Sequence, residues 1–130
     1  LGSSRGVPNL KHLWKGNLAY HDMPKVFKST KVNLNSHIRP SAYGYLNERT
    51  ITCIGSHGFL LTDKVNGLED IFEIDKQIVC WENEDELIDK LKYYLSHDDE
   101  RNQIIKNGYE FVEKNFRVDA FVKKLIEFIT

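Results

Sequence analysis

The sequence predicts an α/β fold: a parallel β-sheet with helices on both faces, followed by a C-terminal helical segment. Short apolar segments alternate with helical patterns between Gly16 and Trp81, and parallel neighbouring strands need such crossover helices between them. The last third of the chain shows apolar residues at helical spacing and no strand pattern. With 130 residues, the chain has the length of one ordinary domain, and we expect a single domain over residues 1–130.

Composition excludes several classes of protein. Hydrophobic residues make up 41% and charged residues 28%, which is typical of a globular chain. The net charge of -1 provides no basic field for nucleic acid. No apolar run is long enough for a membrane span, and no signal-peptide pattern opens the chain. Cys53 and Cys80 lack metal-ligand spacing, so we expect buried, inert thiols in a cytoplasmic protein.

The first quarter of the chain predicts a loop, a strand and a short helix. Residues 1–8 are rich in turn-forming residues, and residues 18–20 form a short candidate strand. Asp22 is suited to cap a helix with Pro24 in its first turn, and this helix should run to about Ser29.

The central elements alternate between strand and helix. We expect a strand over 31–35, a loop over 36–45, and a helix from Glu48 to about Ile54 with Asn47 as its N-cap. A buried strand over 59–62 follows.

A short helix over 67–72 and a strand over 77–81 complete the predicted sheet. Asn83 with Glu86 forms a capping-box pattern before the first of three helices. Each helix carries an apolar stripe that we expect to be core: Leu87, Ile88, Leu91 and Leu95; Ile104, Ile105, Gly108, Phe111 and Val112; Phe121, Val122, Leu125, Phe128 and Ile129. The adjacent Tyr93 and Tyr94 are expected at the surface.

Polar residues are concentrated after the strand that ends at Asn35. His37, Arg39, Tyr43 and Gly44 follow it, at the carboxyl end of a strand, where doubly wound sheets bind their ligands. We therefore predict a binding site there. In the alternative interpretation, Asn35 satisfies a turn backbone and His37 is solvated.

The helix that starts near Asn47 is a second candidate for ligand binding. Its first N–H groups and its dipole favour an anion, and Arg49 could add donors to a diphosphate beside Asn47 and Glu48. Alternatively, Arg49 pairs with Glu48 or Asp63, and Asn47 only caps the helix. The sequence contains no HExxH, GxSxG, Walker A or GxGxxG motif, which argues against several hydrolase, NTPase and dehydrogenase classes.

Several ordered motifs carry a family resemblance: Asp22-Met-Pro, Arg49-Thr, the Gly58-Phe-Leu-Leu-Thr-Asp run, and Asn107-Gly-Tyr. From Trp14 to about Phe128, the chain resembles the C-terminal half of GT-B-fold glycosyltransferases of the spore-maturation-protein-like type, related to glycosyltransferase group 1.

That resemblance implies a Rossmann-like domain of a glycosyltransferase that binds a nucleoside diphosphate sugar. The loop after Asn35 and the helix starting near Asn47 would surround the phosphates, and no metal ion or other cofactor would be required. It also implies an N-terminal domain that precedes residue 1 and supplies acceptor contacts, so the fragment alone should be inactive. The acceptor and the catalytic residues are not assigned.

Two positions depart from the family pattern. Thr52 stands where an acidic residue is expected to hold the nucleotide ribose, and His57 stands where a small residue is usual. These departures leave an alternative open, a non-catalytic Rossmann-like α/β interaction module that has lost donor binding. A flavodoxin-like signalling domain is a weaker alternative, since only Asp63 could serve as its strand-end aspartate.

Overall fold

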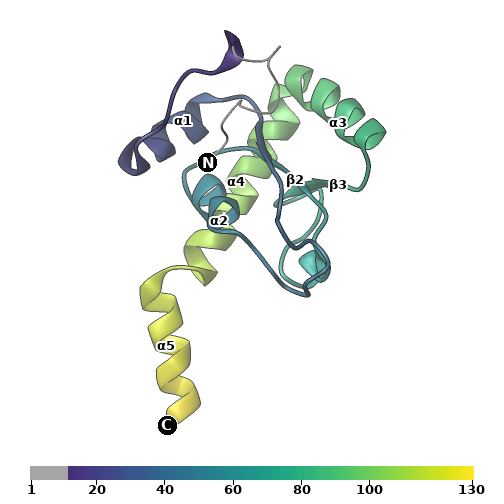
Figure 1. Ribbon diagram of the computed structural model, residues 1–130. Coiled ribbons are helices and arrows are strands. Elements are labelled where there is room, and N and C mark those ends of the chain that lie inside the picture. Colours follow the sequence, from purple (N-terminus) through teal and green to yellow (C-terminus); the bar gives the residue numbers. More distant parts are fainter. Residues whose placement is uncertain (1–11) are drawn as a thin grey trace.

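The computed structural model describes residues 12–130, so the loop expected over residues 1–8 lies outside the described residues. Figure 1 shows the arrangement of the elements. In chain order they are η3 (Tyr20–Asp22), α1 (Met23–Ser29), β1 (Asn33–Asn35), α2 (Glu48–Gly55), β2 (Leu60–Asp63), η4 (Leu68–Asp70), β3 (Val79–Trp81), α3 (Glu84–Ser96), α4 (Asp98–Asn115) and α5 (Val118–Ile129).

The three strands form one parallel sheet in the order β1-β2-β3. Asn35 pairs in register with Thr62, and Asp63 pairs with Trp81, so the strands end together at one edge. Helix α2 connects β1 to β2, as parallel pairing requires. The predicted α/β architecture with a parallel sheet is confirmed.

Apolar clusters cover both faces of the sheet. Because successive side chains of a strand point to opposite faces, neighbouring residues of β2 pack in different clusters. Leu60 packs in a cluster with Ile54 of α2 and Val112 of α4. Its neighbour Leu61 packs in a second cluster with Tyr94 and Ile104 from α3 and α4. The chain therefore buries two apolar layers, one on each side of a three-stranded sheet.

Local signals placed α2 and α3 correctly. Asn47 Oδ1 accepts the Thr50 N–H at 3.1 Å, and Asn83 Oδ1 accepts the Glu86 N–H at 2.9 Å, so both predicted N-caps form. After α2 the chain turns at His57, whose φ of 60° is left-handed. The imidazole stacks on Tyr109 at 3.8 Å between ring centroids, which offsets part of the cost of that conformation.

The strand predicted over residues 18–20 does not form, and the chain there has no regular structure before η3. Leu18 and Tyr20 are 46% and 68% exposed. A short apolar run becomes a strand only when it gains a pairing partner and a surface to cover, and neither is present at this position among the described residues.

The surface prediction for Tyr94 is wrong, and so is the core prediction for two aliphatic residues of α3, Ile88 and Leu95. Tyr94 is 8% exposed and its ring lies 4.8 Å from that of Phe59, whereas Ile88 and Leu95 are 47% and 43% exposed. Helix α3 is rotated so that the larger aromatic surface is buried, since burial favours the residue with more apolar area.

The core prediction for α5 is also wrong. Every residue of this helix except Ala120 is exposed, including Phe121, Leu125 and Phe128. Figure 1 shows the helix extending away from the body of the molecule beyond α4. Its amphipathic pattern is real, but no other described element lies where the apolar face could be buried.

We expect Phe128→Lys in α5 to change the free energy of unfolding by less than about 0.5 kcal/mol, because Phe128 is 87% exposed. The matched core variant Ile104→Ala, at a site 7% exposed, should cost about 2–4 kcal/mol. Urea unfolding of both variants measures the difference. Equal losses in the two variants would contradict the exposed position of α5.

The two thiols behave as the sequence predicts. Cys53 and Cys80 are unpaired and buried. Burial raises the pKa of the Cys53 thiol to about 12 and also raises that of Cys80. Both are therefore neutral near pH 7, and neither has the lowered pKa of a reactive cysteine.

Candidate functional site

The candidate site lies at the carboxyl edge of the sheet. Asn35, Asp63 and Trp81 are the last residues of β1, β2 and β3. Because the strands are parallel, these ends and the loops that leave them share one edge. The segment 36–46 leaves β1 there and leads to the amino terminus of α2.

His37 and Asp63 form a buried pair at this edge. The imidazole is fully buried, and its Nδ1–H donates to Asp63 Oδ1 at 2.6 Å. The His37 backbone N–H donates to Asp63 Oδ2 at 2.9 Å, and Nε2 lies 3.2 Å from Thr50 Oγ1. Asp63 thus accepts two hydrogen bonds from one residue, and the pair fixes the start of the loop to the end of β2.

Two asparagines join β1 to α2. The Asn35 amide donates to Asn47 Oδ1 at 3.1 Å, and the Asn47 amide donates back to Asn35 Oδ1 at 3.0 Å. Asn35 Nδ2 also lies 3.3 Å from the hydroxyl oxygens of Thr50 and Thr62. This network holds the amino terminus of α2 beside the end of β1, where the N–H groups of its first turn face the edge.

The loop itself is held against the segment that follows β2. The Gly44 N–H donates to Asn66 O at 2.8 Å, with Gly44 at a left-handed φ of 66°. The Tyr43 hydroxyl donates to Asp70 Oδ2 at 2.5 Å, which raises the pKa of the phenol, and the Tyr43 ring lies directly over Gly67. A side chain at Gly67 would collide with that ring.

Four predicted site residues lie at the surface or on its margin. Arg39 and Arg49 are exposed, and within residues 12–130 neither side chain has a hydrogen bond or ion pair. Glu48 accepts the Tyr20 hydroxyl at 2.7 Å, and Thr52 Oγ1 donates to Glu48 O at 2.9 Å. The alternative pairing of Arg49 with Glu48 or Asp63 is not formed, because those carboxylates bind Tyr20 and His37.

A cavity of about 580 Å³ opens beyond the ends of β2 and β3. Asp63, Glu69 and Glu82 give its wall an acidic character, and Lys64 is paired with Glu82 at 3.0 Å. Trp81 also lines it, and its indole N–H is buried without a hydrogen-bond partner among the described residues. Carboxylates beside an ammonium group suit hydroxyl-bearing ligand groups, which can both donate and accept.

The structure thus brings together Asn35, His37 and Asn47, and adds three partners that sequence reasoning did not include in the site: Thr50, Thr62 and Asp63. Local signals could have found two of them. Thr50 occupies the third position after an N-cap, and Asp63 ends an apolar strand at the predicted ligand edge.

No group of three or more His, Cys, Asp or Glu side chains within residues 12–130 could hold a metal ion. Over the same range, none of the helices combines the length and apolar character of a membrane span.

Comparison with protein families identifies one match. The family model described as "Glycosyl transferase-like" matches residues 2–127, which is nearly the whole chain. No curated protein and no solved structure matches the chain significantly.

Proposed function

This chain belongs to the glycosyl transferase-like family, and from that premise we propose that it is the donor-binding domain of a glycosyltransferase. In this proposal it binds a nucleoside diphosphate sugar at the carboxyl edge of its sheet. In the same proposal, the acceptor contacts and the catalytic base come from an N-terminal domain of the parent protein, and residues 1–130 alone do not transfer sugar.

The observation that carries this proposal is Arg49 in the first turn of α2, whose side chain is exposed and has no partner within residues 12–130. The helix dipole there favours negative charge, and a guanidinium can donate two parallel hydrogen bonds to phosphate oxygens. Since Asn35 and Asn47 hold this helix end in place, the backbone N–H groups of its first turn are positioned before a ligand arrives.

In this proposal, the charges of the site assign the hydroxyl groups and the phosphates of the donor to two different places. The acidic cavity beyond β2 and β3 would repel a diphosphate, so hydroxyl groups of the ribose or the sugar suit it better. The phosphates belong beside Arg49 and the exposed Arg39 of the loop. Donor N–H groups and arginines can stabilise a leaving diphosphate without a metal ion.

The exposed face of α5 supports the need for a second domain. A contiguous row of apolar side chains, among them Phe121, Leu125 and Ile129, has no cover among the described residues. Apolar surfaces of this kind usually mark an interaction site. In this proposal, the N-terminal domain of the parent protein covers it.

We expect Arg49→Ala in the full-length parent protein to weaken nucleoside diphosphate binding at least tenfold. The reason is the loss of charge-assisted hydrogen bonds, each worth about 1.5–3 kcal/mol. Calorimetric titration with a panel of nucleoside diphosphates and their sugars measures the affinity. Lys92→Ala, which removes an exposed cation from α3, is the matched control and should leave binding unchanged.

If the folded parent protein binds no nucleoside diphosphate and no nucleotide sugar of the panel, this proposal is overturned. That result would favour the alternative of a non-catalytic module that has lost donor binding. One observation favours that alternative: the Thr52 hydroxyl is bound to the helix backbone at Glu48 O, so it does not replace the missing carboxylate.

A further inference from the structure

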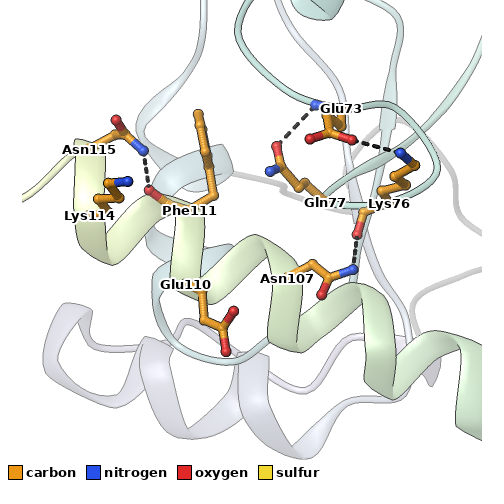
Figure 2. A pocket seen from close by; sticks show the side chains of 8 residues that line it. All are labelled: Glu73, Lys76, Gln77, Asn107, Glu110, Phe111, Lys114 and Asn115. Carbon is orange, nitrogen blue, oxygen red and sulfur yellow. Dashed lines mark hydrogen bonds and ion pairs between the residues drawn. The ribbon is translucent and has the colours of Figure 1, made fainter.

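A second cavity, of about 560 Å³, lies between the segment before β3 and one face of α4. Figure 2 shows the side chains that line it. Gln77 lies two residues before the first residue of β3, so this cavity is at the amino end of that strand. The candidate donor site is at the carboxyl end, and the two share no lining residue.

The loop wall of this cavity is rigidly built. The Gln77 N–H donates to Glu73 O at 2.9 Å, and the Glu73 N–H donates to Gln77 Oε1 at 3.0 Å. Asp75 between them has a left-handed φ of 62°, which is strained for a non-glycine residue. The Asn107 amide donates to Lys76 O at 3.1 Å and ties the loop to α4. The cavity is therefore preformed, as ligand sites usually are.

The helix wall presents an aromatic ring between polar groups. Phe111 and Lys114 are three residues apart and share one face of α4. The Phe111 ring is backed by Phe72 and Phe116, at 5.1 and 6.0 Å between centroids. Within the described part of the chain, Lys114 and Glu110 have no ion pair or hydrogen bond from their side chains. Polar groups that are open to a ligand thus flank a supported ring.

The charges that line the cavity do not favour a strongly ionic ligand. Lys76 is paired with Glu73 at 2.9 Å, and Lys114 balances Glu110, so the lining carries no net charge. The lining contains both hydrogen-bond donors and acceptors, and hydroxyl groups can pair with both. A pyranose presents hydroxyls at its rim and an apolar C–H face that fits an aromatic ring. We propose that this cavity binds a neutral saccharide, separately from the nucleotide-sugar donor.

The test is saturation-transfer NMR and calorimetry of the full-length protein with neutral mono- and disaccharides. We expect Phe111→Leu to weaken saccharide binding at least tenfold, because it removes the flat ring and keeps an apolar side chain. Phe128→Leu removes an exposed ring of α5 that does not line the cavity and should leave binding unchanged. Lys114→Met removes an ammonium group from the lining and should also weaken saccharide binding. Lys106→Met, at an exposed lysine of α4 that does not line the cavity, is its control and should leave binding unchanged.

Three results would overturn the saccharide site: no neutral saccharide binds, both phenylalanine variants lose binding equally, or a peptide competes more strongly than any sugar. Adding a nucleoside diphosphate shows whether the bound saccharide occupies a separate site or the sugar part of the donor site. If the ligand is the sugar of the donor, Arg49→Ala and free nucleoside diphosphate will both reduce saccharide binding, and the separate site is refuted. If neither does, the separate site stands whether or not donor binding is found.

Discussion

Gly108→Ala should lower the free energy of unfolding by about 2 kcal/mol. A Cβ at this position would lie 2.5 Å from the Gln77 carbonyl oxygen and 3.0 Å from Ile54 Cγ2. The nearer atom is backbone, so it cannot rotate away. Alanine favours the helix by about 1 kcal/mol over glycine, and this variant therefore loses stability despite its better helix propensity. Urea unfolding of the purified chain measures the change.

Gly55→Ala is the matched control for this prediction. It lies in α2, and its new Cβ would meet only Val112 Cγ1, at an ordinary 3.4 Å. We expect a change within about 0.5 kcal/mol, or a small gain. If both alanine variants have the same stability, the close approach of α4 to the loop before β3 is refuted.

Asp63→Ala should cost about 3 kcal/mol of stability, because it leaves buried donors without an acceptor. The backbone N–H and ring N–H of His37 both donate to this carboxylate, and Thr62 Oγ1 lies 3.1 Å from it. Asp63→Asn keeps one acceptor oxygen and should cost less, about 1 kcal/mol. Chemical denaturation of the two variants measures both losses.

Asp85→Ala, at an exposed position in the first turn of α3, is the control and should cost no more than about 0.5 kcal/mol. A stable Asp63→Ala variant that loses only nucleotide affinity would contradict the prediction. Asp63 would then be a ligand contact, and not the residue that holds the loop in place.

Local sequence signals predicted the elements whose causes are local. Asn47 and Asn83 cap α2 and α3 because each side chain reaches an N–H three residues along the chain. The position of α4 was predicted by its helical spacing, and Ile104 and Val112 are buried as expected. The same spacing failed for α5, because an amphipathic pattern states which face can be buried and not whether anything covers it.

For the candidate site, too, the sequence predicted the residues with local signals and missed a partner that is distant in the chain. It placed Asn35, His37 and Asn47 at a strand end and a helix start, and the structure brings these three into one network. It did not assign Asp63 as the partner of His37, because those residues are separated by 26 positions and meet only across neighbouring strands. Whether any of the predicted residues binds a donor stays a prediction that titration must test.

The order of apolar segments, caps and turns by itself determined a parallel α/β domain, since strand alternation and helix capping depend on neighbours within a few residues. Tertiary structure alone decided which polar groups remain available. Hydrogen bonding between distant segments engages His37 with Asp63 and Glu48 with Tyr20, whereas Arg49 stays exposed. Such pairs form between residues that are far apart in the chain and close in the fold, so a local sequence pattern does not predict them.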